Sequence, residues 1–158
     1  MKYNAHSQSP EESLAIARIV GASLPSHARV FLDGPMGTGK TLLAKGIYLG
    51  CGGKNADQVV SPSYTLVNLH RDATVPIYHV DLYRLEDKRG ILGLEYEDFL
   101  YENKGVTIVE WPQTAMDLLD EDDILEVLLS EGDSPQSRQF LFRQSGHRYD
   151  DVFRALKS

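Results

Sequence analysis

Apolar residues in the first third of the chain follow helical and strand patterns in turn. The segment Ser9-Pro10-Glu11-Glu12 combines a capping hydroxyl, a proline at the first helical position and an acid three residues after the cap, which predicts a helix to about Leu24. The run Arg29-Val30-Phe31-Leu32 predicts a short strand. After a glycine-rich stretch, apolar residues return at helical spacing, as in Leu42, Leu43, Ala44, Ile47 and Tyr48. This part of the chain therefore predicts helix, strand, loop and helix.

The remainder of the chain carries mostly strand patterns. Residues 64–70 and 75–83 are separated by a turn-like segment, which predicts an antiparallel hairpin, and Pro76 places the second strand at an edge or delays its start. Residues 105–110 form an apolar run closed by an acid, as is typical of a buried parallel strand. Shorter patterns predict a helix at 94–101, one or two helical turns at 114–119, strands at 124–129 and 138–143, and a last helix at about 149–156. Together they predict a three-layer α/β domain with a mixed, mainly parallel sheet flanked by helices.

Length and composition limit the classes of protein that fit. A chain of 158 residues is expected to form a single domain over 1–158. Its net charge of -7 argues against a protein that grips nucleic acid over its whole surface. The single cysteine, Cys51, excludes an internal disulfide and a multi-cysteine zinc site. No apolar segment reaches the roughly 18–20 residues of a membrane span and no signal-peptide pattern is visible, so we expect a cytoplasmic protein away from membranes.

Charged residues are unevenly distributed toward the end of the chain. The segment 117–123 is acidic, whereas the basic residues of the last part are Arg138, Arg143, His147, Arg148, Arg154 and Lys157. Two interpretations stay open at this point. The basic residues belong either to a mixed solvated surface or to a docking face for RNA or an acidic partner.

The glycine-rich stretch Gly34-Pro35-Met36-Gly37-Thr38-Gly39-Lys40-Thr41 matches the phosphate-binding motif G-x-x-x-x-G-K-[ST] without deviation. Its glycines allow backbone N–H groups to turn inward around an anion, and the following helix adds its N-terminal partial positive charge. Lys40 is expected to reach the β- and γ-phosphates and Thr41 to bind Mg²⁺. We expect the nucleotide to contact Gly34, Pro35, Met36, Gly37, Thr38, Gly39, Lys40, Thr41, Leu42 and Trp111.

Two acids at strand ends are candidates to complete the site. Asp81 and Glu110 each lie at or near the end of an apolar run, where an acid that supports Mg²⁺ is needed. Glu110 is the first choice as metal ligand or water-orienting acid, because its run is the cleaner parallel-type strand. Asp81 is the second choice, and for either acid a solvated strand end is an equally valid interpretation. The predicted catalytic residues are thus Lys40, Asp81 and Glu110, and the predicted metal ligands are Thr41 and Glu110.

Other features bear on which nucleotide is bound and what is done with it. The hydroxyl-rich segment 61–65 is either a switch that senses the γ-phosphate or a plain turn. The only tryptophan, Trp111, follows Glu110 and is placed either near the nucleotide or in the core. Asn103-Lys104 lacks the acid of a guanine-reading Asn-Lys-x-Asp segment, which favours ATP or ADP. No arginine-rich lid is evident, which favours hydrolysis over transfer of the phosphoryl group to a metabolite.

With these residues in view, nearly the whole chain resembles the TsaE (YjeE) family, small bacterial ATPases of tRNA threonylcarbamoyladenosine biosynthesis. The resemblance rests on the helix after Ser9, on the phosphate loop and on three further motifs, which are Ser61-Pro62-Ser63-Tyr64-Thr65-Leu66-Val67, His79-Val80-Asp81-Leu82-Tyr83-Arg84-Leu85 and Val109-Glu110-Trp111-Pro112. The family more often has threonine where this chain has Ser63, so a hydroxyl is kept there.

The resemblance implies roles and partners that the spacing of residues does not give. It implies that Lys40 and Thr41 hold phosphate and Mg²⁺, that Glu110 ligates or orders the metal, and that Asp81 supports hydrolysis. It also implies partnership with TsaB-like and TsaD-like proteins, which transfer threonylcarbamoyl to the adenosine next to the anticodon of tRNAs reading A-starting codons. ATP turnover would then reset that complex, and tRNA would be reached only through it.

Three functions follow from these observations. The first is a Mg²⁺-dependent ATPase that is slow alone and stimulated by partners. The second is a small-molecule kinase of the P-loop class, which the same loop would also serve. The third is a nucleotide-sensing module that binds ATP without turnover.

Overall fold

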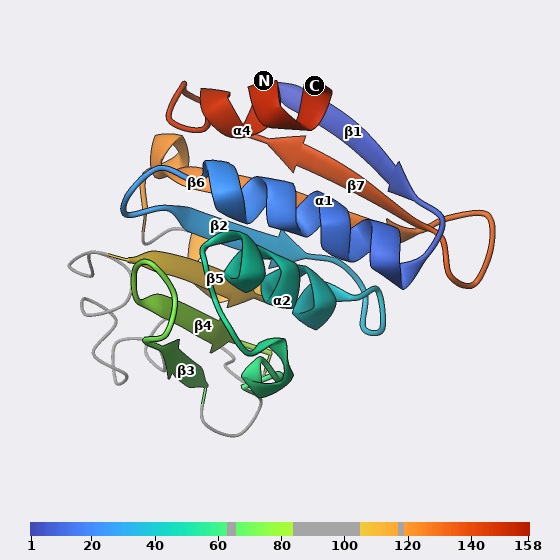
Figure 1. The fold of residues 1–158 in the computed structure, drawn as a ribbon. Coiled ribbons are helices and arrows are strands. Elements are labelled where there is room, and N and C mark those ends of the chain that lie inside the picture. The colour runs from blue at the N-terminus through green and yellow to red at the C-terminus, as the bar shows by residue number, and fades with distance from the viewer. Residues whose placement is uncertain (63–65, 84–104, 117–118) are drawn as a thin grey trace.

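The fold is built around one mixed β-sheet. The computed structural model describes residues 1–158 except 63–65, 84–104 and 117–118. Within the described residues, seven strands join in the order β1-β7-β6-β2-β5-β4-β3 (Figure 1). The strands are β1 (Lys2–Ser7), β2 (Arg29–Asp33), β3 (Val67–His70), β4 (Ile77–Asp81), β5 (Val106–Glu110), β6 (Ile124–Glu131) and β7 (Arg138–Arg143). The helices are α1 (Pro10–Ser23), α2 (Lys40–Gly50) and α4 (Asp150–Lys157), with 3-10 turns η1 (Ala56–Gln58), η3 (Pro112–Thr114) and η5 (Glu121–Asp123).

Parallel pairings hold the centre of the sheet. Strand β2 runs parallel to both β5 and β6, and β5 runs parallel to β4. The antiparallel pairings lie toward the two edges, where β7 joins β6 to β1 and β3 joins β4. Strands β2, β5 and β4 therefore end at the same edge of the sheet, which is where α/β proteins place their ligands. This is the α/β class with a mixed sheet that the sequence predicts.

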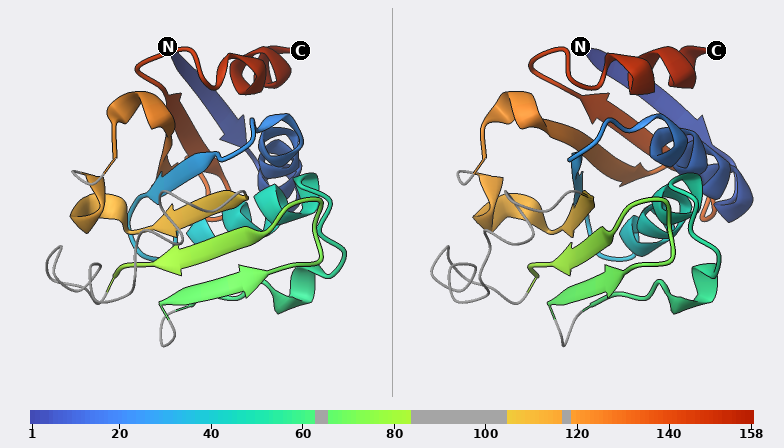
Figure 2. Two further views of the ribbon diagram at one scale, coloured as in Figure 1. Left: turned by 90° about the vertical axis from the view of Figure 1, so that its left-hand side faces the viewer. Right: turned by 60° about the vertical axis from the view of Figure 1, so that its left-hand side comes forward.

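Helices α1, α2 and α4 cover one face of the sheet (Figure 2). Helix α1 begins at the predicted cap, where the backbone N–H of Glu12 donates to Ser9 Oγ at 3.2 Å. Its contact with α2 is close, because a Cβ added to Gly46 would lie only 2.4 Å from the Cβ of Ala17. Larger residues at this crossing would push α2 away from α1 and thereby displace the start of α2.

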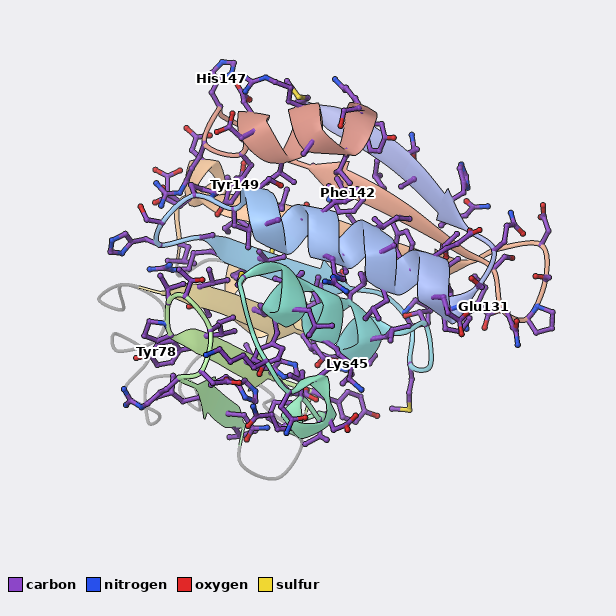
Figure 3. All side chains as sticks on the ribbon, viewed as in Figure 1. Lys45, Tyr78, Glu131, Phe142, His147 and Tyr149 are labelled. Atoms are coloured by element: carbon purple, nitrogen blue, oxygen red, sulfur yellow. The ribbon has the colours of Figure 1, made fainter. Side chains whose placement is uncertain are left out.

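The last helix is tied to the centre of the sheet through Tyr149, which precedes α4 (Figure 3). The buried Tyr149 hydroxyl accepts from the backbone N–H of Arg29 at 2.8 Å and lies 2.7 Å from the carbonyl of Asp123. Burial raises the pKa of this hydroxyl, so it stays protonated and able to donate. The end of the chain thereby anchors the start of β2.

A smaller apolar cluster packs on the opposite face of the sheet. Its buried members are Phe31, Val80, Leu82, Val109, Ala115 and Ile124. In the described residues, the segment around η3 covers part of this face, with Met116 and Leu119 packed against the cluster. The helix predicted at 94–101 lies outside the described residues.

Two details differ from the sequence pattern or refine it. Strand β1 was not expected, because its outward residues are polar and leave only Tyr3, Ala5 and Ser7 directed inward. It forms an edge strand through antiparallel pairing with β7. Pro76 delays the start of β4 to Ile77 and does not place it at an edge, since β4 lies between β5 and β3.

Candidate functional site

The phosphate loop lies between the end of β2 and the start of α2 (Figure 1). Gly37 and Gly39 have φ values of 81° and 97°, in the left-handed region that other residues adopt at an energetic cost. The loop is closed by the buried Thr38, whose hydroxyl donates to the carbonyl of Pro35 at 2.7 Å. The loop sequence therefore folds as a tight turn, with the side chain of Met36 exposed.

Lys40, the first residue of α2, turns its side chain back into this loop. Its Nζ donates to the carbonyls of Gly34 at 2.6 Å and Pro35 at 3.0 Å. The same atom lies 3.9 Å from the centre of the Trp111 ring, within cation–π distance. Burial lowers the pKa of the ammonium, and the nearby Glu110 carboxylate opposes that shift. The positive charge is thus held at the mouth of the loop.

The two strand-end acids face each other across β4 and β5. Asp81 and Glu110 are partners in the register of this parallel pair, and only 4% and 3% of them is exposed. The hydroxyl of Thr41 lies 3.1 and 3.2 Å from the two carboxylate oxygens of Glu110. Asp81 accepts hydrogen bonds from Ser61 Oγ and the backbone N–H of Tyr83, both at 2.9 Å. The structure therefore brings both predicted acids to the start of α2, and it places Glu110 directly on Thr41.

A cleft of about 430 Å³ joins these parts. Its lining residues are Met36, Gly37, Gly39, Lys40, Thr41, Ser61, Asp81, Tyr83, Glu110 and Trp111. Trp111 turns into the cleft through a left-handed backbone, with φ of 56°, and its ring lies 4.8 Å from that of Tyr83. The hydroxyl of Ser61 belongs to this cleft, whereas residues 63–65 of the same predicted switch lie outside the described residues.

A second hollow of about 200 Å³ lies beside the loop. It is lined by Pro10, Ser13, Thr38, Gly39, Leu42, Pro135, Gln136, Arg138 and Phe140. The predicted nucleotide contacts Thr38 and Leu42 thus belong to this hollow and do not line the larger cleft, while Gly39 lines both. Gly34 and Pro35 line neither and instead offer their carbonyls to Lys40.

Two residues at the site were missed from the sequence. Arg138 on β7 donates from Nε to the carbonyl of Thr38 at 3.1 Å and from Nη2 to that of Gly37 at 3.4 Å. His79 on β4 lies with Nε2 2.5 Å from a carboxylate oxygen of Glu110. Strand periodicity marks both as strand residues, and no local signal identifies the distant partners.

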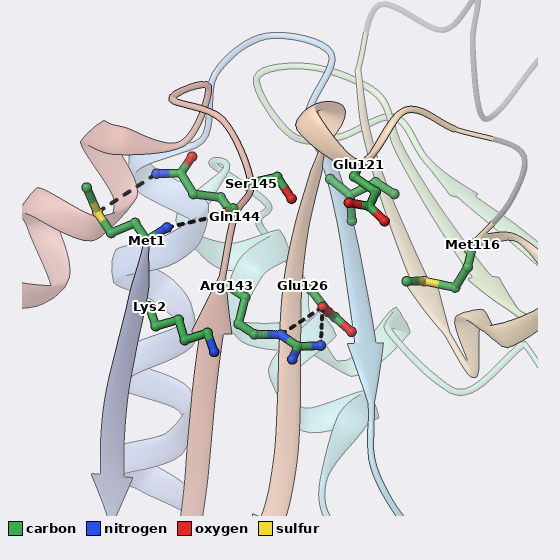
Figure 4. A pocket seen from close by; sticks show the side chains of 9 residues that line it. Met1, Lys2, Met116, Glu121, Glu126, Arg143, Gln144 and Ser145 are labelled. Atoms are coloured by element: carbon green, nitrogen blue, oxygen red, sulfur yellow. Dashed lines mark hydrogen bonds and ion pairs between the residues drawn. The ribbon is translucent and has the colours of Figure 1, made fainter.

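The arginines near the end of the chain engage in separate intramolecular contacts. Arg143 pairs with Glu126 at 2.6 Å, Arg148 donates to the carbonyl of Ser26, and Arg154 pairs with Asp151. The Arg143–Glu126 pair lies in a third hollow, of about 340 Å³, beside Met1 and Glu121 (Figure 4). These contacts favour the interpretation of a mixed solvated surface over that of a single basic face.

The oxygen donors at the loop suit a magnesium ion bound together with a nucleotide. Mg²⁺ in phosphate sites is held by one or two protein oxygens and by phosphate and water oxygens. The Thr41 hydroxyl and the Glu110 carboxylate supply that set side by side. Among the residues the structure describes, no cluster of three or more His, Cys, Asp or Glu side chains could form an all-protein cage.

A parallel sheet core, a phosphate loop leading into a helix and acids at the adjacent strand ends define a P-loop nucleotide-binding protein. The model of the family "Threonylcarbamoyl adenosine biosynthesis protein TsaE" matches residues 7–140. The chain belongs to this family, which is named for tRNA threonylcarbamoyladenosine biosynthesis.

Individual relatives agree with this assignment. The TsaE protein of Bacillus subtilis is 34% identical over 141 residues, covering 89% of this chain and 85% of the relative. TsaE proteins of Nostoc and Haemophilus influenzae are 35% and 38% identical, over 65% and 61% of this chain and 64% and 59% of their own lengths. A crystal structure of Bacillus subtilis YdiB superposes with a TM-score of 0.80 at 26% identity, over 99% of this chain and 95% of that one. The likeness confirms the predicted α/β fold class.

In the part of the chain that the structure describes, no helix is both long and apolar enough to cross a bilayer.

Proposed function

We propose that the chain is a Mg²⁺-dependent ATPase, slow in isolation, that serves threonylcarbamoyl modification of tRNA. The observation that carries the enzymatic part is the convergence of Lys40, Thr41, Asp81 and Glu110 on one cleft. Membership in the TsaE family supports the pathway. A loop that served only as a structural turn would not need two buried acids aimed at its helix.

The polar and aromatic residues of the cleft each have a role in this proposal. Backbone N–H groups of the loop and the Lys40 ammonium bind the β- and γ-phosphates, while the Thr41 hydroxyl and Glu110 hold Mg²⁺. When bound, Mg²⁺ neutralises negative charge on the phosphate oxygens. Asp81, fixed by Ser61 and the Tyr83 N–H, orients the attacking water with its remaining lone pairs. Trp111 and Tyr83 shield one side of the cleft.

The nucleoside is assigned to the hollow beside the loop. Leu42 and Thr38 line that hollow, and they flank the point where the chain enters α2. A triphosphate that runs along the loop from the acid cleft would place its nucleoside end on this side. The apolar Pro10, Pro135 and Phe140 offer surface for a base, and Arg138 offers a cation.

TsaB-like and TsaD-like proteins are the proposed partners, and tRNA is engaged only through the complex. The net charge of -7 and the intramolecular pairing of several arginines support this part, since binding of the tRNA phosphate backbone by the chain alone would need clustered cations. The chain acts in the cytoplasm under this proposal.

Reconstitution tests the function directly. ATP hydrolysis is measured for the chain alone and with TsaB-like and TsaD-like proteins, alongside threonylcarbamoyl incorporation into tRNA. We expect weak hydrolysis alone, a large gain with partners, and loss of both readouts in Lys40→Ala and Thr41→Ala. Unchanged nucleotide binding and turnover in these variants would refute the site. Faster transfer to a metabolite than to water would favour the kinase instead.

A further inference from the structure

His79 is a buried polar residue to which the proposed mechanism assigns no role. It lies on β4 two residues before Asp81 and is 1% exposed. Alternate residues of a strand share a face, so His79 and Asp81 both point toward the helical layer, where α2 begins. In the register of β4 and β5, His79 stands opposite Ile108, one alternation before Glu110. Its ring therefore reaches Glu110 diagonally across the pair.

The contact with Glu110 defines which ring nitrogen carries hydrogen. A carboxylate is an acceptor, so His79 Nε2, 2.5 Å from Glu110 Oε2, is the donor. Among the described residues, Nδ1 has no hydrogen-bond partner although it is buried. Leaving a buried nitrogen unsatisfied opposes folding, so an apolar residue would serve packing better. Within the described residues, the polarity of His79 is thus directed at Glu110.

The two acids of the cleft are held by different means. Asp81 is short, and a backbone N–H and the Ser61 hydroxyl both fix its carboxylate. Glu110 has one more side-chain torsion to order, and its described contacts are the Thr41 hydroxyl and His79. Thr41 is itself a proposed ligand of the metal, so its hydroxyl oxygen would bind the ion while its hydrogen can still be donated to Glu110. His79 is the described donor to Glu110 that does not itself bind the ion.

We propose that His79 is a positioning residue, whose Nε2–H holds the Glu110 carboxylate facing Thr41 so that the pair can bind the magnesium ion of the nucleotide. The inference rests on the proposed function and deepens it by assigning the group that orients the metal-binding acid. Hydrogen bonds of this kind to metal ligands are common, and their removal typically weakens metal binding or activity by about 10- to 100-fold.

Three substitutions at one position separate orientation from packing. In His79→Gln the side-chain amide reaches about as far as Nε2 and can donate to Glu110, whereas His79→Asn is too short and His79→Ala lacks a donor. His70 on the neighbouring strand β3 provides a matched control. It is also buried, its Nε2 has no hydrogen-bond partner among the residues that the structure describes, and its ring packs against Tyr48. His70→Gln therefore reports the effect of changing a buried histidine as such.

The measurements are turnover and ATP affinity as functions of Mg²⁺. For His79→Ala and His79→Asn we expect kcat about 10- to 100-fold lower and the half-saturating Mg²⁺ concentration raised by a similar factor. The KM for ATP at saturating Mg²⁺, and the calorimetric affinity for ATP in EDTA, stay within about twofold of wild type. His79→Gln and His70→Gln keep the wild-type Mg²⁺ requirement.

The outcomes discriminate between orientation, packing and a wrong assignment of function. Should His79→Ala retain the wild-type Mg²⁺ requirement and kcat, the inference is overturned. It is also overturned if Gln, Asn and Ala lower the melting temperature and kcat together without moving the Mg²⁺ requirement, since that is a packing effect. A wild-type chain that binds no ATP, with or without Mg²⁺, overturns the proposed function itself and this inference with it.

Discussion

The cleft between the loop 34–41 and the strand-end acids has two walls, which are built in different ways. The loop wall is one continuous segment, 34–41, whose glycines, lysine and threonine make contacts within a few residues of one another. The acid wall is assembled from three segments that are distant in the chain, namely Ser61, β4 and β5. Thr41 of the loop wall contacts Glu110 of the acid wall across 69 positions of the chain. Ser61 reaches Asp81 across 20 positions and His79 reaches Glu110 across 31.

Under the proposed function, this difference separates nucleotide binding from hydrolysis. A local loop offers N–H groups and an ammonium wherever its strand and helix form, so phosphate affinity follows from a short motif. The acids come together only if β4 and β5 pair in the observed register, since a one-residue slip would turn one carboxylate to the other face. Changes in the loop wall should therefore weaken binding, and changes in the acid wall should mainly affect metal use and turnover.

The largest effect is expected in the loop wall, from Lys40→Ala. Removal of the ammonium leaves phosphate charge unpaired in a buried site, and truncation of such a pair costs about 2–5 kcal/mol, or at least roughly 30-fold in ATP affinity. Titration calorimetry measures this loss. Lys45→Ala, on the same helix but away from the cleft lining, is the control and should bind ATP as wild type does (Figure 3). Equal ATP affinities of the Lys40→Ala and Lys45→Ala variants would contradict the assignment of phosphate binding to the loop wall.

In the acid wall, Glu110→Gln should lower kcat by about 100-fold while ATP still binds in EDTA. Asp81→Asn should also slow turnover, because Asp81 is assigned to the water. The Mg²⁺ requirement separates the two acids, since we expect it to rise in Glu110→Gln and to stay near wild type in Asp81→Asn. The reverse pattern would make Asp81 the metal-binding acid.

The sequence predicts the features that depend on neighbouring residues and misses those that depend on distant ones. The loop motif, the cap at Ser9 and strand β7 follow from short patterns, because glycine freedom, capping and alternation are properties of neighbouring residues. Edge strand β1 was missed because its polar outward residues leave little apolar signal. The local sequence pattern also does not predict roles that depend on residues far away in the chain. Arg138 touches Thr38 from 100 positions away, and periodicity says nothing of that contact.

Arg138 joins the loop wall to β7, and a smaller effect on ATP affinity is expected from Arg138→Ala. Loss of the hydrogen bonds to the Thr38 and Gly37 carbonyls loosens the loop, and about 1 kcal/mol corresponds to roughly fivefold weaker ATP binding. Arg143→Ala on the same strand removes an arginine that pairs with Glu126, so its ATP affinity should not change. Equal losses in the two variants would point to a general effect on β7.

The smallest effect is expected at Trp111, where the two walls touch. In Trp111→Leu the cation–π contact with Lys40 is lost, which should weaken ATP binding by about two- to fivefold as measured by calorimetry. In the wild type, emission from this single tryptophan should change when ATP is added. An unchanged signal would place Trp111 outside the nucleotide site.

The most direct measurement is a crystal structure of the chain with Mg²⁺ and a non-hydrolysable ATP analogue. We predict that the phosphates lie in loop 34–41, that Lys40 leaves the Gly34 and Pro35 carbonyls for a phosphate oxygen, and that Mg²⁺ lies about 2.1 Å from Thr41 Oγ1 with Glu110 beside it. A nucleotide bound elsewhere, or a metal away from both Glu110 and Asp81, would contradict the assignment of this cleft.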